Sequence, residues 1–208
     1  MFIHEEAIVL KSSPFEEKAF IIDLFCENSG LLKIFIQGSN PALAPFTKIS
    51  CVLQKSKSEL YYLKEFNLIE RLPKERTPAA LEISFRLYEA LQGTTRDVQI
   101  YALYKAFLEN IHLAKRPENL LASFLLKLLR HEGFMTVERD PDAYVFADGE
   151  WFRREEAPAW GLILSAQEID DLIFVTTSRS LWDIDEKNFT KSFLMKITKI
   201  FENAKGGT

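Results

Sequence analysis

The 208 residues of this chain suffice for one large domain or two small ones, and a hydrophobic fraction of 47% excludes disorder as the default interpretation. The formal net charge is −4, which excludes the overall basic field that holds many DNA-binding domains to phosphate. The first residues show no signal-peptide pattern, and no apolar run reaches the roughly 18 residues of a membrane helix. We therefore expect a cytoplasmic protein without membrane contact.

The first part of the chain, up to about residue 70, is rich in Ile, Val, Phe and Leu and is interrupted by Gly, Pro, Asn and Ser, a pattern typical of strands. The turn residues Ser13-Pro14, Asn28-Ser29-Gly30 and Gly38-Ser39-Asn40-Pro41 are expected to separate the strands. Five short antiparallel strands favour an OB-type barrel. The predicted strands are Glu6–Ser12, Lys18–Cys26, Leu31–Gln37, Ile49–Lys55 and Leu60–Glu70.

After residue 72 the apolar period changes from two to 3.6, which predicts an OB-fold domain over residues 1–72 and a helical domain over residues 73–208. Thr77-Pro78 is a helix start, and Asp97 is expected to cap a second helix. A third helix begins at Pro117 and stops at Gly133. Its apolar arc is wide, so we expect this helix at the centre of the helical domain.

The last third of the chain contains a predicted hairpin near residues 143–153, with Asp148-Gly149 as its tight turn. Ser165 and Glu168 have the spacing of a capping box, and Asp185 is expected to cap the last helix. The fold class is therefore α+β: a five-stranded OB barrel followed by an all-helical domain with a small hairpin insertion.

Catalytic and metal-binding patterns are missing from the sequence. There is no Gly-rich phosphate loop, no nucleophile elbow and no H-E-x-x-H pair, so we expect no enzymatic activity and no cofactor. Cys26 and Cys51 are far apart within apolar runs, which predicts two buried thiols and no metal site.

Residues 1–76 contain ten basic and ten acidic residues, so a DNA-binding face must come from segregation of charge. Aromatic side chains can stack on bases, and Phe35, Tyr61 and Tyr62 are candidates, each of which has core packing as its alternative. Each lysine has an ordinary position on the protein surface as its alternative. The predicted DNA-binding residues are Lys11, Lys18, Lys33, Lys48, Lys55, Lys57, Lys64 and Tyr61.

An ordered series of segments resembles the RecO family of bacterial recombination mediators. These are Ala7-Ile8-Val9-Leu10-Lys11, Pro14-Phe15-Glu16-Glu17, Phe20-Ile21-Ile22-Asp23-Leu24-Phe25, Ser29-Gly30-Leu31, Gly38, Leu43-Ala44-Pro45-Phe46-Thr47 and Leu63-Lys64-Glu65-Phe66-Asn67-Leu68-Ile69-Glu70. Further on, the segment from Phe124 to Phe134 resembles the family's central helix. The resemblance covers most of residues 5–134 and rests on the order of the segments.

The resemblance implies an OB barrel followed by a helical domain, binding of single- and double-stranded DNA, and annealing of complementary strands in DNA repair and recombination. It also implies contact with RecR and with the acidic tail of single-strand-binding protein, and an indirect role in loading RecA. The location it implies is the bacterial cytosol, in association with the nucleoid.

This sequence departs from the family pattern at four places, one of which is Ser13, where relatives commonly carry Arg before Pro. The segment Gln37–Ala42 is short and uncharged where relatives carry a basic stretch, and the expected zinc-binding cysteines are missing after the central helix. Ala122-Ser123 stands where relatives carry arginines, so Lys127 and Arg130 become the candidates for the partner tail.

Two further functional classes remain as alternatives to the mediator. The acidic balance and the uncharged loop favour an OB-containing scaffold that binds proteins and has little or no affinity for DNA. A hydrolase hidden in the helical part would require a deep pocket with converging polar groups.

Overall fold

The computed structural model of the chain describes residues 2–56, 60–92, 94, 97–136, 142–147 and 150–206. Two compact units make up the fold, residues 1–112 and residues 113–208. The predicted domain boundary after residue 72 coincides with the end of the strands, whereas the division between the compact units follows the second helix. None of the helices in the described ranges combines the length and the apolar character that crossing a membrane requires.

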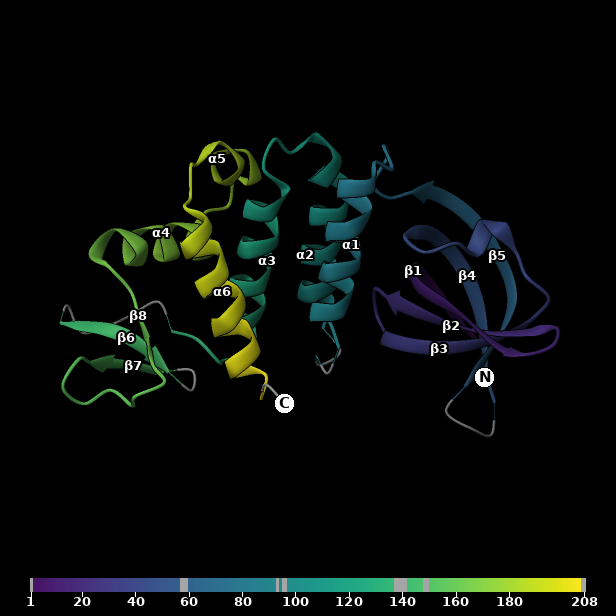
Figure 1. Ribbon diagram of the computed structural model, residues 1–208. Helices are drawn as coiled ribbons and strands as arrows, with labels where there is room; N and C mark the ends of the chain where they lie inside the picture. The colour runs from purple at the N-terminus through teal and green to yellow at the C-terminus, as the bar shows by residue number, and fades with distance from the viewer. Residues whose placement is uncertain are drawn as a thin grey trace. The chain divides into compact units, whose positions relative to one another are not determined.

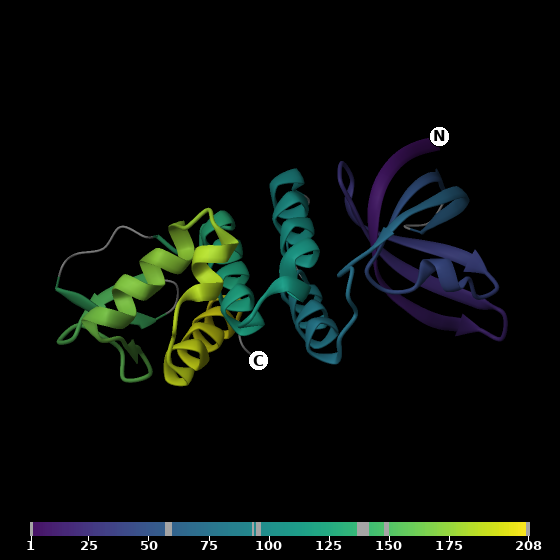
Figure 2. The same ribbon diagram turned by 90° about the horizontal axis from the view of Figure 1, so that it is seen from above.

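The first unit begins with a closed five-stranded barrel of order β1-β2-β3-β5-β4, which confirms the predicted OB architecture (Figures 1 and 2). Neighbouring strands are antiparallel except β3 and β5, which run parallel where the barrel closes. The strands are β1 (Phe2–Glu16), β2 (Ala19–Cys26), β3 (Gly30–Gln37), β4 (Thr47–Lys55) and β5 (Tyr61–Arg71).

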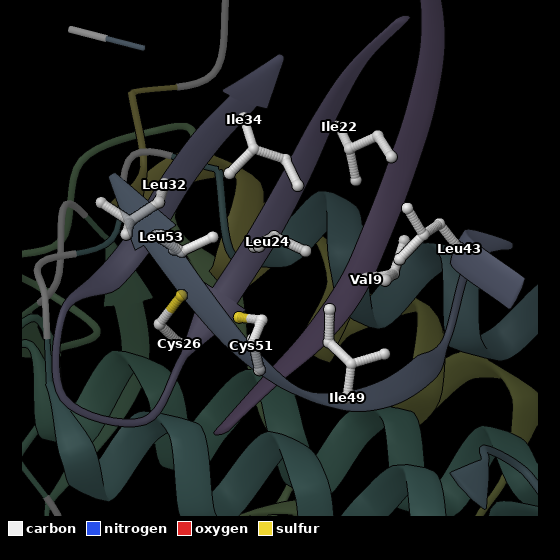
Figure 3. Packing of buried hydrophobic residues seen from close by; sticks show 11 residues of the cluster. Val9, Ile22, Leu24, Cys26, Leu32, Ile34, Leu43, Ile49, Cys51 and Leu53 are labelled. Carbon is white, nitrogen blue, oxygen red and sulfur yellow. The ribbon is translucent and has the colours of Figure 1, made fainter. Parts of the chain in front are cut away.

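Apolar side chains at alternate positions of each strand fill the barrel interior, as the period of two requires. Figure 3 shows Ile22 and Leu24 of β2, Ile34 of β3 and Leu53 of β4 converging on this interior, and all four are buried. Cys51 is buried in the same cluster.

Strand β1 is longer than predicted, because it continues through Ser13-Pro14 to Glu16 instead of ending there. Pro14 still pairs with Phe20 of β2, and the register shifts between Pro14 and Glu16. Proline is accepted in a strand at a bulge, where no ladder hydrogen bond from its nitrogen is needed. The extension places Phe15 next to the outer face of β3.

The segment Leu43-Ala44-Pro45-Phe46 is part of the barrel packing. A short 3₁₀ helix, η1 (Pro41–Leu43), is capped by Asn40, whose side-chain oxygen accepts from the Ala42 N–H at 3.0 Å. Leu43 enters the barrel core. Phe46 has φ of 61°, and its ring is buried against Phe85 with a centroid separation of 4.8 Å. The packing and two backbone hydrogen bonds, to Val9 and from Leu72, offset the strain of this left-handed conformation.

Helices α1 (Pro78–Ala90) and α2 (Val98–Asn110) complete the first unit, and Thr77 and Asp97 cap them as predicted. The ring of Phe25 on β2 contacts Tyr101 and Tyr104 of α2 at centroid separations of 5.4 and 5.8 Å. These rings are fully buried, so the outer surface of the barrel has its own apolar interface with the helices.

The second unit is organised around α3 (Pro117–His131), whose residues 119–126, 128 and 129 are all buried. This helix packs against α4 (Ala166–Thr177), α5 (Leu181–Glu186) and α6 (Lys191–Ala204), which confirms its central position. The predicted capping box at the start of α4 is present, with Ser165 and Glu168 bonded reciprocally.

The predicted hairpin exists as β6 (Ala143–Ala147) and β7 (Glu150–Arg153), and its turn at residues 148–149 lies outside the described ranges. A third strand that the sequence did not predict, β8 (Leu162–Ile163), pairs with the other edge of β6.

The prediction that Asp185 caps the last helix is wrong. Thr190 caps α6, and Asp185 lies in the short helix α5. The Asp185 carboxylate instead accepts the backbone N–H groups of Lys115 and Arg116 at 2.9 and 2.7 Å, directly before α3. A buried carboxylate requires such donors, and these two come from a segment about 70 residues earlier in the chain.

Candidate nucleic-acid interface

An aromatic cluster covers the outer face of the barrel over β3 and β5. Phe35 and Tyr62 are register partners on these parallel strands, and their rings meet edge to face at a centroid separation of 6.0 Å. Phe15, at the end of β1, packs edge to face on Phe35 at 6.3 Å. Phe15 is 54% exposed and Tyr62 is 45% exposed, so both rings offer surface to a ligand. We call Phe15, Phe35 and Tyr62 the aromatic cluster.

Two open hollows flank the aromatic cluster and share Phe35 and Gln37 in their walls. One has a volume of about 500 Å³ and extends from Tyr62 and Lys64 toward Asn40. The other has a volume of about 820 Å³ and extends along Lys18, at the turn between β1 and β2. OB barrels hold single strands on this part of the fold, so the hollows lie where a bound strand would run.

Positive charge adjoins the cluster on both sides. The Lys64 ammonium lies 5.9 Å from the centroid of the Tyr62 ring. Lys18 lines the second hollow, in which Glu17 is the acidic neighbour. Lys33 projects from β3 two residues before Phe35 and is exposed. The arrangement combines faces for stacking with cations for phosphate, the two elements that sequence-tolerant binding of single strands uses.

The structure places the predicted lysines in three different situations. Lys57 lies outside the described residues, and Lys48 is buried. The remaining predicted lysines are exposed on the barrel: Lys11, Lys18, Lys33, Lys55 and Lys64.

Lys48 is a correction to the predicted set, because its side chain is 8% exposed and serves an internal ion pair. Its ammonium lies 2.9 Å from Glu6 Oε1 and 3.8 Å from Glu70 Oε1. Burial on its own lowers the pKa of Lys48, but the hydrogen bond to Glu6 and the negative charges outweigh it and raise the pKa above its ordinary value. Glu6 also contacts Lys105 and Tyr101 of α2, so this cluster joins β1, β4 and β5 to α2.

Tyr61 is the second correction. Its ring packs against the barrel core, whereas the neighbouring Tyr62 points outward to the cluster. Successive side chains of a strand point to opposite faces, so only one of the two tyrosines can reach a ligand on the outer face. Sequence reasoning missed Phe15 because it placed a break between strands at Ser13-Pro14.

The candidates for the partner tail lie in the second unit and differ in their availability. The Lys127 amino group donates to the carbonyls of Val175, Thr176 and Ser178 at 3.0, 3.4 and 2.7 Å, at the C-terminal end of α4. Burial, together with the charge of Arg130, lowers the pKa of Lys127 to about 8. Arg130 is exposed in the last turn of α3, so it is the more accessible of the two.

Both cysteines are buried free thiols in the barrel core, as predicted. Burial raises the pKa of Cys51 to about 12 and raises that of Cys26 well above its ordinary value, so neither thiol is poised for nucleophilic chemistry. Within the described ranges no three His, Cys, Asp or Glu side chains are grouped so that they could hold a metal ion.

Comparison with known proteins shows which proteins this barrel is similar to. Residues 1–72, which comprise the whole barrel, match the family model described as "Recombination protein O N terminal". This barrel is therefore similar to the N-terminal domain of RecO proteins.

Two relatives extend the similarity beyond the barrel. A DNA repair protein RecO from Idiomarina loihiensis is 23% identical over 202 residues, covering 88% of this chain and 85% of the relative. A second protein of the same name, from Caldanaerobacter subterraneus subsp. tengcongensis, is 29% identical over 149 residues, covering 65% of this chain and 60% of the relative. These similarities to proteins named DNA repair protein RecO support a role in DNA repair.

Proposed function

We propose that this chain is a recombination mediator that binds single-stranded DNA across the outer face of β3 and β5. The observation that carries the proposal is the exposed aromatic cluster with Lys18 and Lys64 beside it, on a barrel similar to the N-terminal domain of RecO proteins. Bases stack on the rings of Phe35 and Tyr62, and the lysines contact phosphates. No covalent step is part of this function.

The proposal extends to partners that the family resemblance implies. RecR docks on the chain, the acidic tail of single-strand-binding protein is held by the helical unit, and together these contacts promote strand annealing and the loading of RecA. Arg130 is the cation that we assign to the tail, because it is exposed whereas the amino group of Lys127 is bonded to α4.

The test of DNA binding is a fluorescence-anisotropy titration of an oligo(dT) strand at several salt concentrations. Stacking contributes about 1–3 kcal/mol per base, so Tyr62→Ala should weaken binding by roughly 5- to 150-fold. Tyr144→Ala is the matched control, because Tyr144 is also an exposed strand tyrosine, at 37%, but lies in the other unit. Lys64→Glu should lower the slope of log K against log salt by about 0.7 for the lost phosphate contact.

The second candidate function is a scaffold that binds proteins without DNA, which the net charge of −4 favours. It predicts no binding of the oligonucleotide even at low salt and with RecR present. Equal losses for Tyr62→Ala and Tyr144→Ala would place the DNA elsewhere on the chain.

Partner binding has its own experiment. A peptide with the acidic tail sequence of single-strand-binding protein should bind the wild-type chain, and Arg130→Glu should weaken it. Arg179→Glu, at an exposed position outside α3, is the control for the change in net charge. If both substitutions weaken the peptide equally, the tail responds to overall charge and not to this helix.

A further inference from the structure

A small cavity lies between the outer surface of the barrel and α1, within the first unit. Its volume is about 100 Å³. Leu10 and Leu31 lie on its apolar wall, while Leu24 and Leu32, whose side chains point into the barrel interior, border it from their strands. The rim is polar and consists of Asp23, Lys33, Tyr88 and Gln92. Lys33 and Gln92 are exposed, so the mouth of the cavity opens to solvent beside β3.

The polar groups of the rim leave hydrogen-bonding capacity for a ligand. The Tyr88 hydroxyl donates to Asp23 Oδ2 at 3.2 Å. Among the described residues, Tyr88 is the donor to the Asp23 carboxylate. Oδ1 and one lone pair of Oδ2 can therefore accept hydrogen bonds from a ligand. Lys33 faces Asp23 across β2 and β3 as its register partner and supplies donors beside the carboxylate.

The cavity adjoins the aromatic cluster along strand β3. Lys33 and Phe35 are two residues apart, so they project to the same face about 6.6 Å from each other. Asp23 and Ile21 are their respective partners on β2. A DNA strand that stacks one base on Phe35 and Tyr62 and continues along β3 therefore brings its next nucleotide to Lys33 and to the mouth of the cavity.

We propose that this cavity receives the edge of one guanine base from a strand held on the aromatic cluster, an inference that rests on the proposed function. Guanine presents two neighbouring donors, N1–H and N2–H, which match the two oxygens of the Asp23 carboxylate. Its O6 then accepts from the Lys33 ammonium. Cytosine and adenine offer this carboxylate one amino group next to a ring-nitrogen acceptor, and thymine offers one N–H between two carbonyls.

The size and the walls of the cavity fit such an edge. An apolar cavity of about 150 Å³ holds a benzene ring, so a cavity of about 100 Å³ with an open mouth admits part of one base and not a stacked pair. Enzymes that read an unstacked base use the same combination of apolar walls and hydrogen bonds to its Watson–Crick edge. The cavity therefore gives an otherwise sequence-tolerant surface a preference at one position.

The test compares oligo(dT) strands that carry one central dT, dG or dI with the full-length chain. The wild-type protein should bind the dG strand about tenfold more tightly than the all-dT strand, and the dI strand, which lacks the N2 amino group, should lose most of that preference. Asp23→Asn keeps an acceptor for the Tyr88 hydroxyl but removes the carboxylate, so the dG to dT affinity ratio should fall toward one. Glu27→Gln is the matched control, because it removes one negative charge at the exposed β2–β3 turn without touching the cavity.

The ratio separates this inference from the function on which it rests. Tyr62→Ala should weaken the dG and dT strands alike and leave their ratio near ten. Equal wild-type affinity for dG and dT strands, with Tyr62→Ala still weakening both, overturns the guanine site and leaves single-strand binding standing. Absence of binding to every strand overturns both. A ratio that Asp23→Asn leaves unchanged also overturns the site, provided that the thermal unfolding of this variant matches that of the wild type.

Discussion

Replacing Lys48 by Met tests whether this lysine serves the fold or the proposed DNA-binding face. The substitution removes the ammonium that lies 2.9 Å from Glu6 and keeps a side chain of similar length. Glu6 is then left with Lys105 at 3.8 Å and with the Tyr101 hydroxyl at 3.4 Å. Removing one partner of a fully buried ion pair costs about 3–5 kcal/mol. The Glu6 side chain is 32% exposed and water can take up part of its charge, so we expect a loss of about 1–3 kcal/mol.

The assay is urea unfolding at neutral pH, applied to Lys48→Met, Glu6→Gln and the double variant. The losses in free energy of unfolding of the two single variants should add up to more than the loss of the double variant. The difference, which is the coupling between the two residues, should be about 1 kcal/mol or more. Because the pKa of Lys48 is raised in the native state, its contribution is complete at neutral pH and is lost only as the pH rises through the native pKa.

DNA affinity supplies the refuting result. Lys48→Met should bind single strands as tightly as the wild type does, whereas Lys64→Glu should bind them more weakly. A Lys48→Met variant that unfolds at the wild-type urea concentration but binds DNA about tenfold more weakly would show that the Lys48 ammonium meets phosphate, and the structural assignment would be wrong.

Three further predictions concern the second unit. Phe124→Ala should lower the free energy of unfolding by about 3–5 kcal/mol, because the ring is completely buried in the central helix, and a loss below 1 kcal/mol in urea would contradict this. Gly161→Ala should cost about 1–3 kcal/mol by thermal unfolding, because its Cβ would overlap the buried Val145 side chain, and an unchanged midpoint would mean that β8 moves freely away from β6. The pKa of Lys127 is about 8 in the native state and near 10.5 in the unfolded state. Between these values the unfolded state binds more protons, so the free energy of unfolding of the wild type should rise from pH 8 to pH 10 relative to that of Lys127→Met. A constant difference between the two midpoints across that range would contradict the lowered pKa.

Helix starts were predictable because a cap depends on residues within one turn. Thr77 and Asp97 accept backbone N–H groups of the turns that follow them, and Ser165 with Glu168 forms the complete box. Asp185 fails the same rule for a physical reason. A carboxylate three to five residues before an apolar stripe can cap it, but here it binds the N–H groups of Lys115 and Arg116, and Thr190 stands closer to the helix. The sequence carries no local sign of that distant pairing.

The outward-facing residues of the barrel were only partly predictable. Successive side chains of a strand alternate between its faces, so the apolar Leu63 places its neighbours Tyr62 and Lys64 on the other side of β5. The same alternation separates Tyr62 from Tyr61, and it was readable from the sequence. The burial of Lys48 had no such signal, because Glu6 reaches it through the antiparallel pairing of β1 with β4. The pairing register between strands far apart in the sequence decides which charged side chains of a small barrel form internal ion pairs.

That distinction also explains how a segment with balanced charges can present a cationic face. Glu6 and Glu70 are tied to Lys48 where the barrel meets α2, and the buried Glu5 accepts from the Asn28 N–H and the Ser29 hydroxyl at the β2–β3 turn. Asp23 accepts from the Tyr88 hydroxyl, and Arg76 donates to the Pro45 carbonyl. Four acids and two bases of the segment are thus committed to internal contacts, which leaves a small excess of positive charge among its other residues. Near the aromatic cluster the cations are Lys18, which has Glu17 beside it, and Lys64, with Lys33 further along β3. For the proposed single-strand binding, two to three phosphate contacts imply a slope of log K against log salt of about −1.4 to −2.1, so we expect the stacked rings rather than the charges to supply most of the affinity at physiological salt.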